Sequence, residues 1–113
     1  MKKILLCLSL ISLNAFAGMT VQEYQNFKDK DALSWYIVGL GNGFAFSNTK
    51  LESLKQKRLY CLPNNYKIST SELQGLLSES ITEFDSKEVL NLQIEPMLLR
   101  KLIDTYPCKR SIQ

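Results

Sequence analysis

The chain has 113 residues, with 14 lysines and arginines, 11 aspartates and glutamates and no histidine. This length suffices for one small domain, and the lack of histidine removes a common metal ligand and the side chain that most often activates a nucleophile. Two of the basic residues, Lys2 and Lys3, precede an apolar run, so basic and acidic residues nearly balance in the rest of the chain. The sequence contains no basic stripe interleaved with aromatic residues, the pattern that would indicate nucleic-acid binding.

The first 17 residues have the pattern of a secretory signal peptide. Two lysines are followed by an apolar run over residues 4–13, and Ala15 and Ala17 are small residues at the positions that specify cleavage. We expect cleavage after Ala17, export to the periplasm, and a single domain over residues 18–113. One alternative is a membrane anchor, but the run is about half the ~20 residues that span a bilayer. A lipoprotein signal ending at Cys7 would leave almost no apolar segment before that cysteine.

Two cysteines remain after that cleavage, Cys61 and Cys108, and each lies next to or one residue from a proline. An isolated pair in an oxidising compartment predicts a disulfide. A free-thiol nucleophile would need an activating base, and two thiolates alone provide half of a zinc site. We therefore expect a disulfide that ties the end of the chain to its midpoint, and neither a metal nor a cofactor.

The segment after the signal peptide begins with a helix signal. Thr20 and Glu23 form a capping box, which predicts a first helix to about Phe27. Charged residues 28–31 predict a turn, with Asp31 as the N-cap of the next helix. From residue 32 apolar side chains occupy nearly every side of a helix, which predicts a buried central helix with Trp35 in the core rather than in a dimer interface.

Three glycines, Gly39, Gly41 and Gly43, lie two apart in that segment. A phosphate-binding glycine loop would need a preceding strand and a different spacing. We favour either the close approach of a neighbouring helix or fraying of this one. Residues 44–48 either extend the helix or begin a loop.

A basic and leucine-containing stretch leads to a turn in the middle of the chain. Its basic side chains are Lys50, Lys55, Lys57 and Arg58. We interpret them as a solvated helix face rather than a phosphate-binding site. Residues 60–65 contain the proline and asparagines of a turn, and residues 66–68 are extended at most, so no sheet is expected.

Two more helices are predicted in the second half. Ser69 and Glu72 form a second capping box, and Pro96 suits the first turn of a last helix that ends at Pro107. The two apolar stripes are Leu73, Leu76, Leu77, Ile81 and Phe84, and Met97, Leu98, Leu99, Leu102, Ile103 and Tyr106. Between them we expect a polar connection with a short helical turn. The predicted fold is all-α, a small bundle of four to five helices tied by one disulfide.

The order of several short motifs resembles the Rap/Tai-type family of periplasmic proteins. These motifs are Tyr36-Ile37-Val38-Gly39, Tyr60-Cys61-Leu62-Pro63, the capped helix with Leu73, and the ending Leu102 to Tyr106-Pro107-Cys108. The resemblance covers roughly residues 20 to 109. Many members carry a second cysteine pair where this chain has Phe27 and Leu33, as expected if an apolar contact has replaced that bond.

This resemblance implies an all-helical immunity protein that binds and blocks a peptidoglycan amidase delivered by type VI secretion. It also implies a dimer that occludes the catalytic cleft of the toxin with a helix and an adjoining loop. The alternative is a general periplasmic stress protein or chaperone of the HdeA-like kind, which shares export, size and a single disulfide. An enzyme with a Ser/Lys or Asp/Glu site is a third and unsupported option.

Polarity suggests two surfaces for such a partner. The first comprises Glu79, Glu83, Asp85, Ser86, Lys87 and Glu88, and the second comprises Asn64, Asn65 and Tyr66 beside the disulfide. An acidic surface suits a basic partner, and a simply solvated helix face is the other interpretation of the same glutamates. Catalysis by paired carboxylates would need burial that raises a pKa, and nothing in the sequence indicates it.

Overall fold

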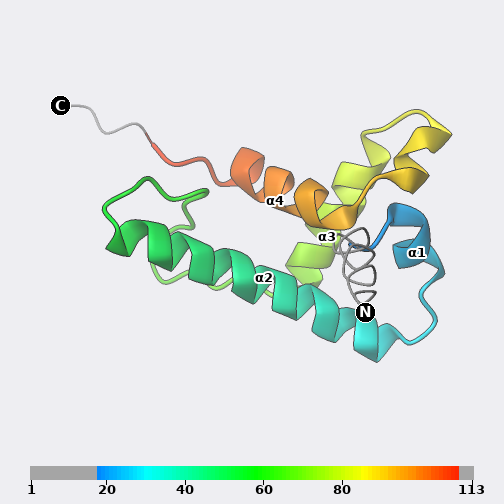
Figure 1. Ribbon diagram of the computed structural model, residues 1–113, viewed down its shortest axis with the longest axis horizontal. Coiled ribbons are helices and arrows are strands. Elements are labelled where there is room, and N and C mark those ends of the chain that lie inside the picture. The colour runs from blue at the N-terminus through cyan, green and yellow to red at the C-terminus, as the bar shows by residue number, and fades with distance from the viewer. Residues whose placement is uncertain (1–17, 110–113) are drawn as a thin grey trace, which may run out of the picture.

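The computed structural model describes residues 18–109, which form an all-α fold with no named strand in that range (Figure 1). Its elements are α1 (Val21–Asn26), α2 (Lys30–Ser53), α3 (Thr70–Thr82), the 3-10 helix η2 (Lys87–Asn91) and α4 (Ile94–Thr105). A disulfide joins Cys61 to Cys108. The predicted all-α bundle with one disulfide is thus confirmed. The predicted signal peptide, residues 1–17, and the tail beyond residue 109 lie outside the described residues.

Both predicted capping boxes are present. The Thr20 side chain accepts a hydrogen bond from Glu23 N at 3.1 Å, and the Glu23 carboxylate accepts one from Thr20 N, also at 3.1 Å. At the start of α3, Ser69 and Glu72 make the same pair of hydrogen bonds. Each box satisfies backbone N–H groups that have no partner within the helix, which explains why α1 and α3 begin where the sequence predicts.

The start of α2 differs from the prediction. Asp29, and not Asp31, caps this helix, and its carboxylate accepts a hydrogen bond from Ala32 N at 3.0 Å. Asp31 instead lies in the first turn, where a negative charge is favourable. The helix continues through the three glycines and residues 44–48, so it neither frays nor ends there. None of the helices in residues 18–109 is long and apolar enough to cross a bilayer.

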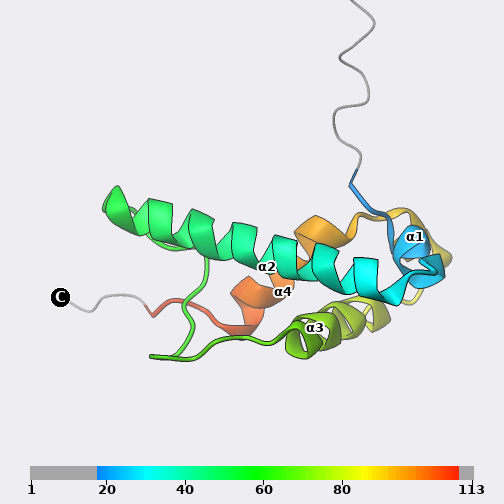
Figure 2. The ribbon, with the colours of Figure 1, turned by 90° about the horizontal axis from the view of Figure 1, so that it is seen from below.

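The expected burial of α2 on all sides is wrong. Only Leu33, Ile37 and Asn48 are buried along it, whereas 74% of Trp35 and 73% of Phe46 are exposed. The reason is length: α2 has 24 residues, and α3 and α4 have 13 and 12. Figure 2 shows α2 extending far past α3 on the left of the view. The domain is too small to cover the outer face of its longest helix, and Trp35 is on that face.

The core lies where α3 packs against α4 and against one face of α2. Its fully buried large side chains are Val21, Ile37, Leu77, Ile94, Leu98 and Leu102. A Cβ on Gly41 would lie 2.7 Å from Leu73 Cδ1, so here the glycine does permit close approach of α2 to α3. One expected core member is misplaced: Phe84 follows the end of α3 and is 45% exposed.

The segment before α1 pairs with the segment before α4. Val21 N donates to Leu92 O at 2.9 Å, and Ile94 N donates to Met19 O at 2.9 Å. Thr20 and Gln93 form an isolated antiparallel bridge between these segments. This short pairing closes the start of the domain onto the N-terminus of α4.

Candidate partner-binding surfaces

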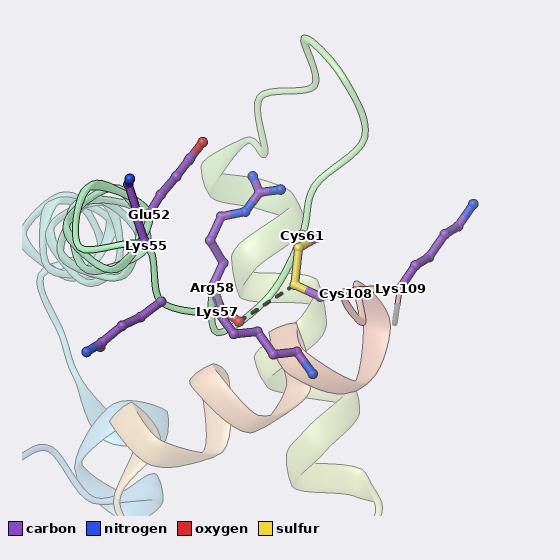
Figure 3. A pocket seen from close by; sticks show the side chains of 8 residues that line it. Glu52, Lys55, Lys57, Arg58, Cys61, Cys108 and Lys109 are labelled. Carbon is purple, nitrogen blue, oxygen red and sulfur yellow. Dashed lines mark hydrogen bonds between the residues drawn. A yellow bond between two sulfur atoms is a disulfide. The ribbon is translucent and has the colours of Figure 1, made fainter. Parts of the chain in front are cut away.

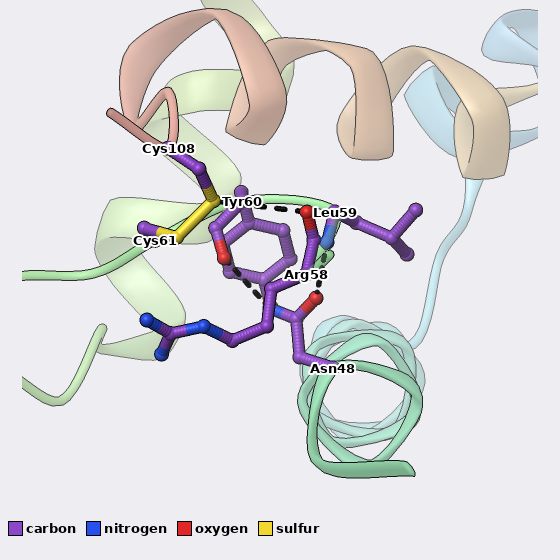
Figure 4. Close-up of a disulfide and its surroundings, with 6 residues drawn as sticks. All are labelled: Asn48, Arg58, Leu59, Tyr60, Cys61 and Cys108. Carbon is purple, nitrogen blue, oxygen red and sulfur yellow. Dashed lines mark hydrogen bonds between the residues drawn. A yellow bond between two sulfur atoms is a disulfide. The ribbon is translucent and has the colours of Figure 1, made fainter. Parts of the chain in front are cut away.

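The disulfide fixes the segment that leads into the loop of Asn64, Asn65 and Tyr66. Cys61 and Cys108 have their Cα atoms 4.9 Å apart, and Cys61 N donates to Tyr106 O at 2.8 Å (Figure 4). Pro107 lies between these two attachments on the C-terminal side. The covalent bond and the hydrogen bond together hold the segment before Pro63 against the end of α4.

Asn48 holds the same segment from the other side. This buried side chain on α2 donates from Nδ2 to Tyr60 O at 3.0 Å and accepts at Oδ1 from Leu59 N at 2.7 Å. Figure 4 shows the amide pointing from α2 toward this backbone, next to the disulfide. We call residues 58–61 with Asn48 and the disulfide the clasp. A single buried asparagine gives no recognisable pattern in the sequence, so this element was missed.

The predicted surface Asn64, Asn65 and Tyr66 lies just beyond the clasp. All three side chains are exposed or half-exposed, and Asn65 adopts a left-handed conformation with φ 61° at the tip of the turn. Tyr66 is partly engaged within the domain, because its hydroxyl bonds the Glu72 carboxylate and its ring centroid lies 6.2 Å from that of Tyr106. The two asparagines are therefore the more accessible part of this surface.

The acidic surface lies at the other end of α3. Lys101 from α4 reaches Glu83 at 2.6 Å and Glu79 at 3.7 Å. Its side chain is only 17% exposed, against 67% and 60% for Glu79 and Glu83. The hydrogen bond to Glu83 is the main cause that raises the pKa of Lys101. Lys101 thus pairs with both glutamates and reduces their repulsion. The spacing within α3 alone could not reveal this pairing, because the lysine comes from α4.

The structure brings the remaining predicted residues of this surface together after α3, in the loop and in the first residues of η2. Asp85, Ser86, Lys87 and Glu88 are all exposed. The Ser86 hydroxyl accepts a hydrogen bond from Glu88 N at 3.2 Å and so begins η2. Phe84 lies in the same loop, so this end of the molecule presents an exposed aromatic ring among carboxylates. The two predicted surfaces do not meet, since they lie at opposite ends of the 13-residue α3.

Basic side chains gather around the disulfide end. A shallow depression of about 670 Å³ there is lined by Lys55, Lys57, Arg58 and Lys109 beside the two cysteines. Figure 3 shows these chains fanning outward rather than converging on one point. Of the four basic residues predicted to share a solvated helix face, Lys50 lies on α2, whereas Lys55, Lys57 and Arg58 lie in the loop after it; all four are exposed. Nothing in this arrangement forms a defined anion site.

The outer face of α2 is a third candidate. Trp35 and Phe46 are eleven residues apart, about three helical turns, and therefore point in nearly the same direction. Between them, Gly39 and Gly43 have no atom within 4 Å of an added Cβ. Residues 32–49 contain no charged side chain. We call this face the α2 stripe. It contributes to a groove of about 550 Å³.

A partly buried carboxylate lies at the start of α4, and no sequence motif predicts it. Glu95 Oε2 accepts a hydrogen bond from Met19 N at 2.8 Å and another from the Tyr36 hydroxyl. Burial of the ring, together with this carboxylate, raises the pKa of Tyr36 to about 12. The other oxygen, Glu95 Oε1, is buried and has no hydrogen-bond partner among the described residues.

Within residues 18–109, no three cysteine, aspartate or glutamate side chains are grouped closely enough to hold a metal ion. The described part of the chain has three exposed candidate surfaces: the acidic surface, the loop of Asn64 and Asn65, and the apolar α2 stripe. Comparisons of the chain with protein-family models, curated proteins and solved structures found no match to any of them.

Proposed function

We propose that this protein is an exported, non-enzymatic binding protein that inhibits a peptidoglycan amidase toxin delivered by type VI secretion, in the periplasm. The identity of the toxin class comes from the Rap/Tai-type resemblance of the sequence. The observation that carries the proposal in the structure is the acidic surface, with Phe84 exposed among Glu79, Glu83, Asp85 and Glu88. Buried aromatic anchors surrounded by polar groups provide much of the binding energy in protein interfaces.

The shape of this surface suits the occlusion of a cleft. It consists of the end of a helix and the loop that follows, and that loop projects from the bundle at the α3–η2 connection (Figure 1). Four carboxylates and two lysines, Lys87 and Lys101, leave it negative, so the complementary surface on the toxin is basic with an apolar pocket for Phe84. The loop of Asn64 and Asn65 is the second proposed contact.

The test uses the mature protein and candidate secreted amidases in a pull-down, followed by an assay of cell-wall cleavage. We expect a stoichiometric complex and loss of cleavage. D85K/E88K reverses two charges that make no ion pair within residues 18–109, and we expect it to weaken binding at least tenfold, mainly through faster dissociation and slower association. F84A should weaken binding by a comparable factor.

The matched control is K55E/K57E, which reverses two exposed charges at the disulfide end of the molecule. It should leave binding within about twofold of the wild type. Equal affinity of D85K/E88K and the wild type would contradict the assignment of the acidic surface. If K55E/K57E or a change at Asn64 and Asn65 abolished binding instead, the toxin would dock at the other end.

We further propose that the α2 stripe mediates a homodimer. An uncharged helix face with Trp35 and Phe46 at its ends and two glycines between them allows a second copy of α2 to approach its backbone closely. W35A/F46A should convert the dimer to a monomer in sedimentation equilibrium, while K55E/K57E, an exposed change beyond the end of the same helix, should not. A wild-type chain that sediments as a monomer at micromolar concentration would refute this part.

The alternative function is an HdeA-like periplasmic chaperone, and the exposed α2 stripe is the observation that favours it. Such a protein would use this apolar surface to hold unfolded clients in acid. Client proteins should then remain soluble at about pH 3, where carboxylates are largely protonated, and W35A/F46A should abolish this protection. Lack of protection together with an amidase complex would decide for the inhibitor.

A further inference from the structure

Glu95 is only half satisfied. Its Oε2 atom has two donors, Met19 N and the Tyr36 hydroxyl, but its Oε1 atom is buried without a hydrogen-bond partner in the described part of the chain. An unsatisfied buried acceptor is costly, and more so when it belongs to a carboxylate. The geometry therefore calls for a donor on the Oε1 side.

Gly18 lies directly against that side. A Cβ built on Gly18 would be 2.5 Å from Glu95 Oε1 and 3.0 Å from Gln93 Oε1. For a methyl group this position is a severe clash. For a nitrogen with protons it is a few tenths of an ångström shorter than a charge-assisted N–H···O hydrogen bond, so a small shift of the Glu95 side chain gives normal geometry. The point next to Gly18 is thus unsuitable for carbon and suitable for an ammonium group.

The α-nitrogen of Gly18 can reach that point by one rotation. The nitrogen and the Cβ position are both substituents of Cα at about 1.5 Å, so a turn of roughly 120° about the Cα–C bond exchanges them. While residue 17 is attached, such a rotation would have to carry the preceding chain with it, and the nitrogen is an uncharged amide. Once Gly18 is the first residue, the rotation is unhindered and the nitrogen is an ammonium.

We infer that Glu95 Oε1 and Gln93 Oε1 form a binding site for the free α-ammonium group of Gly18, which removal of residues 1–17 creates. The site would lock the new N-terminus onto the start of α4, beside the pairing of Met19 with Ile94. Only the processed chain could complete it. This inference rests on the proposed export and its cleavage position.

One other titratable group contacts Glu95, and a second lies in α1, shortly after Gly18 in the chain. Tyr36 approaches Glu95 from α2, and Glu23 of α1 binds the backbone of Thr20. Tyr36 is neutral below about pH 12, and Glu23, whose pKa is lowered by its bonds to Thr20, is charged at neutral pH. At neutral pH the ammonium therefore meets the Glu95 side chain and no opposing positive charge from Tyr36 or Glu23.

The test compares two purified chains, residues 18–113 and residues 17–113, which share every described residue. In the shorter chain Gly18 N is an ammonium, whereas in the longer chain it is an amide and the ammonium is on Ala17. In urea unfolding at neutral pH, we expect a folding equilibrium constant about tenfold larger for the chain that begins at Gly18, a typical effect of one charge-assisted hydrogen bond. In E95Q the two chains should differ by less than twofold. Acetylation of Gly18 N should reproduce the longer chain.

Y36F is the matched control, because it removes another partner of Glu95 without changing the ammonium site. It should lower the stability of both chains while preserving the tenfold difference between them. Equal stability of the two wild-type chains, or a difference that persists in E95Q, would overturn the inference. If E95Q does not fold, NMR titration of Gly18 in the wild type decides, since its α-amino pKa must lie above the ordinary value near 8.

These outcomes are separable from the proposed function. Mass spectrometry of the exported protein gives its first residue, and a start other than Gly18 would refute the cleavage position, and with it the completion of this site by processing, while leaving the proposed export intact. Failure to bind an amidase would likewise leave the Glu95 site untouched.

Discussion

The double variant C61A/C108A is expected to lose about 4 kcal/mol of unfolding free energy, a large part of the stability of so small a domain. The disulfide joins residues 47 positions apart and encloses α3, η2 and α4 in one covalent loop. Without it, the unfolded chain gains the freedom of that loop, while the folded state keeps its helix–helix core. Chemical denaturation monitored by circular dichroism measures the difference.

Reduction provides the control for this experiment. A thiol reductant should lower the stability of the wild type by the same amount and leave C61A/C108A unchanged, because no other described residue is a cysteine. A loss below about 1 kcal/mol would mean that the unfolded state is already compact enough for the crosslink to remove little entropy.

The sequence predicts helix starts well where the signal is local. Thr20 with Glu23, and Ser69 with Glu72, each satisfy backbone donors within four residues, so no distant contact is needed to define them. The N-cap of α2 was misassigned because Asp29 and Asp31 are both adequate caps. The choice between them depends on where the preceding chain leaves α1, which is a tertiary property.

Burial was predicted less well, because composition does not reveal how many neighbours a helix has. The apolar residues of α2 suggested a central helix, yet α3 and α4 cover only one face and leave Trp35 in solvent. Phe84 followed the spacing of a buried stripe, but α3 ends at Thr82 and the chain turns away. The same two errors revealed the candidate surfaces, since an apolar residue outside the core indicates a contact still to be made.

The charged pairs of the site also depend on contacts between segments distant in sequence. Glu79 and Glu83 are four residues apart on α3, and Lys101, which pairs with both, comes from α4. Glu95 and Gly18 are 77 positions apart and meet only through the pairing of residues 19–21 with residues 92–94. A single sequence identifies the side chains that can form such sites, and the topology decides which of them meet.

The second large effect is expected at Asn48. N48A removes the donor to Tyr60 O and the acceptor for Leu59 N, and leaves both backbone groups without their partner next to a buried ring. Each unsatisfied buried group costs about 1–3 kcal/mol, and water partly offsets this cost at the more exposed Leu59. We therefore expect N48A to lose about 2–3 kcal/mol of unfolding free energy. T49A, which removes only a hydrogen bond within α2, should change stability by less than about 0.5 kcal/mol.

The decisive version of this experiment combines N48A with C61A/C108A. Asn48 and the disulfide hold residues 58–61 from opposite sides, one from α2 and one from the end of α4. Once either attachment is lost, residues 58–61 can move, and the remaining attachment contributes less to the stability of the folded state. We therefore expect the combined loss to fall short of the sum by at least about 1 kcal/mol. Additive losses would show that α2 and the C-terminal segment are held independently. The clasp would then not be one unit that positions the loop of Asn64 and Asn65.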